Sequence, residues 1–107
     1  MPINPRYSKL FEPLEIGPVT TPNRFYQVPH CTGMGYSLPE TLTAMRSVKA
    51  EGGWGVVCTE YASIHPSSDD TPFPSCTWWD NGDVSTMSVV ADAIHEHGAL
   101  AGTQLWH

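Results

Sequence analysis

Apolar positions along this chain form three short runs that predict strands, separated by two stretches with helical spacing. Residues 54–60 make a nearly continuous apolar run, the pattern of a parallel strand that is covered on both faces. Residues 24–28 predict a buried strand that Pro29 ends, and 99–106 predict a third strand. The order strand, helix, strand, helix, strand indicates parallel strands joined by right-handed crossovers.

The two predicted helices occupy 40–51 and 83–97. The first follows Pro39, a residue that a first helical turn tolerates. In the second, Asp83 is the predicted N-cap and Gly98 the stop signal. The apolar positions that predict the buried faces of these helices are Leu42, Met45, Val48, Val84, Met87, Ala91 and Ile94.

The remaining segments predict connections. Residues 1–8 are expected to be an exposed lead-in, and 9–21 predict a short hairpin with its turn at Gly17 and Pro18. The segment 61–82 is long and irregular, but its tryptophans argue against disorder, so we expect a functional loop there.

A hairpin followed by repeated strand–helix units is the pattern at the start of a (β/α)₈ barrel, or TIM barrel. Such a barrel needs about 250 residues to close, whereas this chain has 107. The expected fold class is therefore α/β: an N-terminal hairpin and the first three βα units of an incomplete TIM barrel. Residues 1–107 are expected to be the N-terminal part of one domain, with the remainder of the barrel and any C-terminal domains absent.

Composition excludes several classes of function. Five Lys and Arg against eleven Asp and Glu give a net charge of -6, which argues against a nucleic-acid partner. No apolar run reaches the roughly 18 residues that a membrane span needs, and no signal peptide is evident, so a cytoplasmic protein is expected. The three cysteines lack CxxC spacing, which favours neither a disulfide framework nor a metal site.

Polar and aromatic side chains follow each predicted strand. In a TIM barrel the active site lies at the carboxyl ends of the strands. That rule brings together Pro29, His30 and Cys31 after the first strand, Tyr61 after the second, and Gln104 in the third. A cysteine thiolate is a nucleophile, and a polar amide inside an apolar strand needs a partner. These residues are the predicted site.

The chain resembles the old yellow enzyme family of FMN-dependent oxidoreductases in the segments 10–13 (LFEP), 23–25 (NRF) and 104–107 (QLWH). Within that family, three segments are similar to the trimethylamine, dimethylamine and histamine dehydrogenase branch: 28–31 (VPHC), 46–54 (RSVKAEGGW) and 59–61 (TEY). The likeness runs from about residue 10 to the last residue.

The resemblance implies roles for the predicted site residues. Cys31 takes the place of the cysteine that these amine dehydrogenases join through sulfur to carbon 6 of FMN; an unlinked wall residue is the alternative. Pro29 and His30 would pack beside the flavin, and Gln104 would hydrogen-bond its pyrimidine edge. Tyr61 would contact a cationic amine substrate through its ring face.

For the full-length enzyme, the resemblance implies a small alkylamine or similar substrate, oxidised by hydride transfer to FMN. It also implies a 4Fe-4S cluster held by later parts of the chain, an electron acceptor such as an electron-transfer flavoprotein, and a homo-oligomer. One alternative is an NAD(P)H-dependent ene or dienoyl reductase with non-covalent FMN. Another is that residues 1–107 alone are an inactive fragment or a binding unit.

Overall fold

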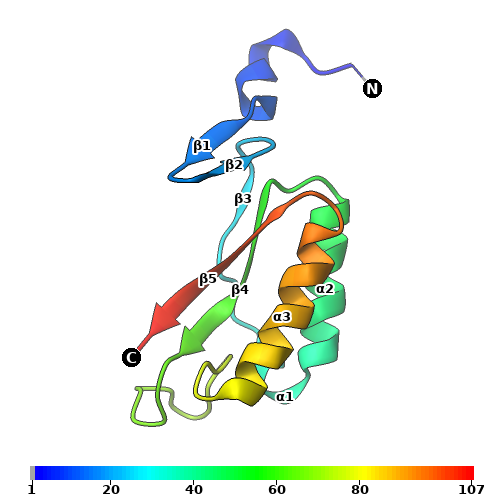
Figure 1. Ribbon diagram of the computed structural model, residues 1–107. Helices are drawn as coiled ribbons and strands as arrows, with labels where there is room; N and C mark the ends of the chain where they lie inside the picture. Colours follow the sequence, from blue (N-terminus) through cyan, green and yellow to red (C-terminus); the bar gives the residue numbers. More distant parts are fainter. Residues whose placement is uncertain (1) are drawn as a thin grey trace.

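The computed structural model describes residues 2–107 and begins with two small elements (Figure 1). A 3₁₀-helix, η1 (Pro5–Phe11), leads into an antiparallel hairpin of β1 (Leu14–Ile16) and β2 (Val19–Thr21). Gly17 in the turn has φ 56°, a left-handed conformation that glycine adopts without strain. The predicted hairpin and its turn are confirmed. Residues 2–8 of the lead-in are exposed as expected, although part of this segment is helical, and residue 1 lies outside the described residues.

Three parallel strands form the main sheet, in the order β3 (Tyr26–Gln27), β4 (Val56–Ser63) and β5 (Leu100–Trp106). Helix α2 (Pro39–Glu51) connects β3 to β4, and α3 (Asn81–His95) connects β4 to β5. Both helices cover the same face of the sheet, and the hairpin lies beyond the amino-terminal ends of the strands (Figure 1). Neighbours in sequence are neighbours in the sheet, as in a (β/α)₈ barrel.

Two strands differ in length from the prediction, and hydrogen bonding explains both differences. β3 is shorter, because the Arg24 N–H donates to the Leu10 carbonyl, 2.9 Å away, instead of extending the sheet. β4 continues to Ser63, because its last three residues pair with 104–106 of β5. The irregular loop is correspondingly shorter, and the short helix α1 (Met34–Ser37) adds a turn that no pattern predicted.

A β-bulge interrupts the pairing of β4 with β5. Cys58 pairs with Gly102, but Tyr61 pairs with Gln104, so three steps along β4 match two along β5. Such an extra residue changes the face to which all later side chains of the strand point.

The core shows the effect of the bulge. Val57, before it, and Ala62, after it, both belong to the hydrophobic cluster between sheet and helices. They lie five positions apart, a spacing that would put them on opposite faces of a regular strand. The bulge therefore also turns Tyr61 to the face away from the helices.

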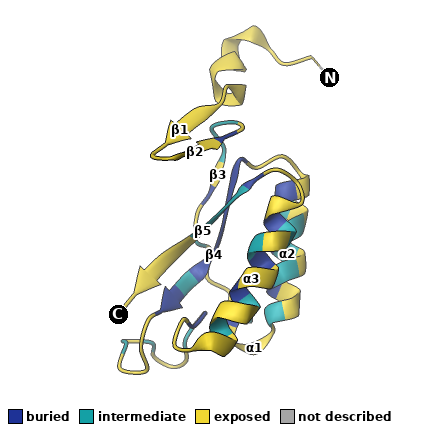
Figure 2. Cartoon of the chain, in the orientation of Figure 1, coloured by how far each residue is buried: buried dark blue, intermediate teal, exposed yellow. Residues whose placement is uncertain are grey.

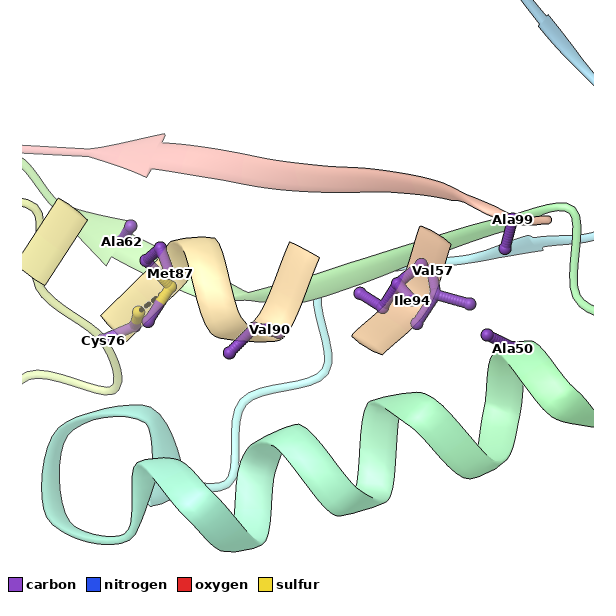
Figure 3. Packing of buried hydrophobic residues seen from close by; sticks show 8 residues of the cluster. All are labelled: Ala50, Val57, Ala62, Cys76, Met87, Val90, Ile94 and Ala99. Carbon is purple, nitrogen blue, oxygen red and sulfur yellow. Dashed lines mark hydrogen bonds between the residues drawn. The ribbon is translucent and has the colours of Figure 1, made fainter. Parts of the chain in front are cut away.

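The hydrophobic core lies between the sheet and helices α2 and α3 (Figure 3). Its members are Ala50, Val57, Ala62, Cys76, Met87, Val90, Ile94 and Ala99. β4 is buried except for the half-buried Tyr61, whereas the end of β5 and the hairpin, apart from Thr21, are exposed (Figure 2). Within residues 2–107, none of the helices is both long and apolar enough to cross a membrane.

The buried face of α2 differs from the predicted one. Leu42 is buried as expected, but Val48 is 65% exposed and the other buried positions are Arg46 and Ala50. The buried residues of α2 are thus four positions apart, rather than the predicted three. The prediction was wrong at Val48 because it excluded a charged residue from the core, and Arg46 is buried with a backbone partner.

Asp80, rather than the predicted Asp83, is the N-cap of α3. Its Oδ1 accepts hydrogen bonds from the N–H groups of Gly82 at 2.8 Å and Asp83 at 3.1 Å. The carboxylate of Asp83 instead accepts from the Thr77 hydroxyl and the Trp79 N–H, both at 2.8 Å. Asp83 therefore fastens the preceding loop to the first turn of the helix.

Candidate functional site

The predicted site residues lie at or just beyond the carboxyl ends of three adjacent parallel strands. Pro29, His30 and Cys31 follow β3, Tyr61 is near the end of β4, and Gln104 is near the end of β5. Because these strands are parallel and paired in order, their carboxyl ends share one edge of the sheet. The structure thus brings the three predicted groups to the same edge.

Cys31 is an exposed free thiol in the segment that follows β3. Its Sγ has one polar contact, with the Pro29 carbonyl at 3.9 Å. His30 beside it is also exposed, and Pro29 is half-buried. The thiol is therefore accessible to a ligand above the strand ends.

The carboxylate of Glu60 binds the segment that follows Cys31. Glu60 is fully buried, with no exposed surface. It accepts hydrogen bonds from the N–H groups of Thr32, Gly33 at 2.6 Å and Gly35 at 2.8 Å, and from the Thr32 hydroxyl at 3.1 Å. Bonds from several donors compensate the cost of burying the carboxylate.

The segment that donates hydrogen bonds to Glu60 requires glycine at two positions. Gly33 has φ 80°, which favours glycine. A Cβ on Gly35 would lie 2.9 Å from the Ser75 carbonyl oxygen and 3.0 Å from the Cys76 Cβ. Gly33 and Gly35 therefore allow the chain to wrap around Glu60 and to approach the β4–α3 loop.

Arg46 binds the segment that precedes Cys31. It is fully buried on α2 and donates through Nη2 to the His30 carbonyl at 2.5 Å. Burial lowers the pKa of its guanidinium, and the negative charge of Glu60 opposes that change. Among the described residues 2–107, Nε and Nη1 of Arg46 find no partner.

An aromatic pair stands at the ends of β4 and β5. The ring centroids of Tyr61 and Trp106 are 5.4 Å apart, with planes inclined at 46°. The indole N–H of Trp106 donates to the Asp69 carbonyl at 2.9 Å, which fixes its orientation. Gln104 pairs in register with Tyr61 and is exposed.

The donor set suits a flavin. The exposed thiol of Cys31 is a nucleophile, and the exposed amide of Gln104 offers both a donor and an acceptor to a ring edge. The rings of Tyr61 and Trp106 provide an apolar wall at the same edge of the sheet. In the described part of the chain, no three His, Cys, Asp or Glu side chains are grouped to hold a metal ion.

Sequence patterns missed the buried charges of this region. Glu60 was noticed only as part of a strand end, and Arg46 only as part of a resembling segment. One signal was available for Glu60: a lone carboxylate that directly follows a buried apolar run needs hydrogen-bond donors. A glycine-containing loop, such as that at Gly33 and Gly35, can provide them with backbone N–H groups.

Comparison with known proteins identifies the relationship. Residues 9–107 match the NADH:flavin oxidoreductase / NADH oxidase family. The chain belongs to this family. Dimethylamine dehydrogenase of Hyphomicrobium sp. (strain x) is 49% identical over 104 residues, covering 97% of this chain.

Solved structures of related proteins have the same fold as this chain over almost all of its length. Histamine dehydrogenase from Rhizobium sp. 4-9 matches 94% of the chain with a TM-score of 0.88 and 50% identity. The 6-hydroxypseudooxynicotine amine oxidase of Pseudomonas geniculata N1 matches 95%, with a TM-score of 0.89 and 51% identity. The fold class is confirmed: the hairpin and first three strands of a TIM barrel, with the sheet open and the third βα unit represented by its strand.

The share of the relatives that is matched is small. The chain covers 14% of the dimethylamine dehydrogenase, 14% of the histamine dehydrogenase and 15% of the amine oxidase. Residues 1–107 thus correspond to a limited part of each of these longer proteins.

Proposed function

We propose that these residues form the N-terminal part of the barrel domain of an FMN-dependent amine dehydrogenase. The observation that carries the proposal is the exposed Cys31 at the strand-end edge that also bears the Tyr61–Trp106 pair. The likeness of about 50% to proteins named for the oxidation of amines supports it. The rest of the barrel would come from further chain.

Each site residue has a proposed task. Cys31 would hold FMN through a sulfur–carbon bond, Pro29 and His30 would pack beside the ring, and Gln104 would bind its pyrimidine edge. Bound FMN would supply the acceptor for a hydride from the carbon beside the amine nitrogen. These residues orient the flavin at the carboxyl edge of the sheet, where the substrate also enters.

The substrate is proposed to be a small alkylamine or a similar cationic amine. The ring face of Tyr61 attracts a cation by about 0.5–2 kcal/mol, and this contact does not require a hydrogen bond. The iminium product would hydrolyse to an aldehyde and a smaller amine. Electrons would leave through a 4Fe-4S cluster elsewhere in the full-length protein to an acceptor such as an electron-transfer flavoprotein, and the enzyme would be a homo-oligomer.

Acid precipitation of the full-length protein tests the flavin bond. We expect the yellow colour to stay with the wild-type pellet and to move to the supernatant in Cys31→Ser. Anaerobic mixing with dimethylamine or histamine should bleach the flavin absorbance. Bleaching by NAD(P)H but not by any amine, with free flavin in the wild-type supernatant, would favour an ene or dienoyl reductase instead.

A further inference from the structure

Two fully buried charged side chains bind the backbone on either side of Cys31. Arg46, from α2, donates to the carbonyl of His30, the residue before the cysteine. Glu60, from β4, accepts from the N–H of Thr32, the residue after it, and from two further N–H groups. The exposed Cys31 thus lies between two residues whose backbone groups are held in place by buried charged side chains.

Buried charges such as Arg46 and Glu60 are more than is needed to hold a surface loop in place. A surface loop of this kind is normally held by neutral backbone bonds, and a charge is costly to bury. Here two charges are buried without direct contact, since the one ion pair among residues 2–107 joins Lys9 and Glu12. Each charge is therefore directed at the loop itself, where charge-assisted bonds are short and directional.

The side chain of Cys31 has almost no contacts that would fix the position of its thiol. Cys31 is exposed, and its single polar contact spans 3.9 Å. Bond formation between two groups requires reacting atoms about 3–3.5 Å apart in a suitable orientation. The place of Sγ must therefore be set through the backbone, and the backbone is held by Arg46 and Glu60.

We propose that Glu60 and Arg46 are positioning residues that fix the backbone on both sides of Cys31 and so hold its thiol for attachment to the flavin. This inference rests on the proposed function, in which Cys31 bonds to FMN. Attachment would replace the S–H bond of Cys31 and the C–H bond at ring carbon 6 by a sulfur–carbon bond. The two protons would be lost, and the two electrons would reduce the flavin, which the electron acceptor of the proposed function would reoxidise. Both side chains are fully buried, away from the exposed surface at which Cys31 lies. Both act through the segment 30–35, and β4 and α2 are the rigid elements that support it.

The test uses the full-length protein with Glu60→Gln and Arg46→Met. Glu60→Gln keeps the side-chain shape but directs an NH₂ group at backbone donors, and Arg46→Met removes the donor to His30. We expect FMN occupancy to be kept while the fraction of flavin that resists acid precipitation falls about 10-fold or more, since small misplacements are costly. Arg46→Lys keeps one donor and should restore part of that fraction.

Two matched controls separate position from general stability. Glu51→Gln and Arg6→Met remove exposed charges outside the segment and should leave the acid-resistant fraction unchanged. Thr32→Val removes the hydroxyl that donates to Glu60 and accepts from the Met34 N–H at 3.4 Å, but it leaves the backbone donors to Glu60 in place. It should give a smaller loss, which keeps the test available if Glu60→Gln does not fold. A lower melting temperature with an unchanged acid-resistant fraction would overturn the proposal.

Failure of the flavin bond itself is a different result. If wild-type flavin is released by acid, the positioning role is measured by a nitroxide label on Cys31 in the FMN-free full-length protein. An immobile label that becomes mobile in Glu60→Gln and Arg46→Met supports positioning, although the flavin bond is then lost as a proposal. Equal label mobility in all variants overturns positioning as well.

Discussion

The three cysteines of this chain differ in surroundings and therefore in reactivity. Burial raises the pKa of the Cys76 thiol to about 12 from 9.0, and burial likewise raises that of Cys58. A thiol with a raised pKa stays protonated and poorly nucleophilic near neutral pH. The thiol of Cys31 is exposed, so a reagent in solution can reach it.

Selective alkylation checks this difference. In FMN-free full-length protein at pH 8, iodoacetamide should modify Cys31 and leave Cys58 and Cys76 unmodified until the chain unfolds, as read by mass spectrometry. Because the Cys76 pKa is raised in the folded state, its contribution to stability is complete below about pH 9 and lost as pH rises toward about 12. Equal modification of Cys76 and Cys31 in the folded protein would contradict the prediction.

Tyr61 allows a test of cation binding. Tyr61→Leu removes the ring face and should raise KM for a small amine by about 2- to 30-fold, the equivalent of 0.5–2 kcal/mol. Tyr61→Phe keeps the ring and should stay close to wild type. A similar rise of KM in both variants would show that the hydroxyl, rather than the ring, binds the amine.

At the level of single residues, the sequence predicted which side chains reach the strand ends but not what holds them. Cys31, Tyr61 and Gln104 were found because the carboxyl-end rule depends only on strand positions. Arg46 was not found, because a charged residue in a helix is normally assigned to the solvent face. Its burial depends on a carbonyl sixteen residues earlier, a contact that only the folded chain provides.

At the level of elements, the helices and strands were predictable in kind and approximate place. Their ends were not, because each end depends on a specific hydrogen bond. Asp80 and Asp83 both suit a helix N-terminus, and only the structure shows that Asp80 accepts the N–H groups of the first turn. The end of β4 likewise depends on its pairing with β5 beyond the bulge.

Gly35 provides a test of how closely the segment after β3 approaches the loop between β4 and α3. Gly35→Ala would place its Cβ 2.9 Å from the Ser75 carbonyl, and such overpacking costs about 1–3 kcal/mol. We expect a lower melting temperature of the full-length protein and a lower acid-resistant flavin fraction. Gly52→Ala is the control, because its Cβ would make only ordinary contacts at 3.4 Å. Equal melting temperatures for the two variants would contradict the close approach.

At the level of the whole molecule, the described residues form an extended body. The radius of gyration is 15.0 Å, against about 13 Å for a compact domain of 100 residues. Large apolar side chains on the strands remain exposed, including Tyr26, Leu105 and Trp106. The open sheet therefore presents apolar surface that a closed barrel would cover.

Residues 1–107 produced alone are accordingly expected to be poorly soluble, to bind a dye that reports apolar surface, and to bind no FMN. The full-length protein should lack the dye signal and carry flavin. Dye fluorescence and analytical gel filtration would measure the difference. A soluble, cooperatively melting 107-residue monomer would instead indicate an independent unit.

The extra residue in β4 reverses the alternation of side chains between the two faces of the strand. Before the bulge, odd positions such as Val57 face the helices, and after it even positions such as Ala62 do. Substitutions near Tyr61 change a side chain but leave this count intact. Loss or gain of one residue at 59–60 would exchange the two faces, burying the ring of Tyr61 and exposing Ala62. Length, more than side-chain identity, is therefore the quantity that evolution and design must conserve in this strand.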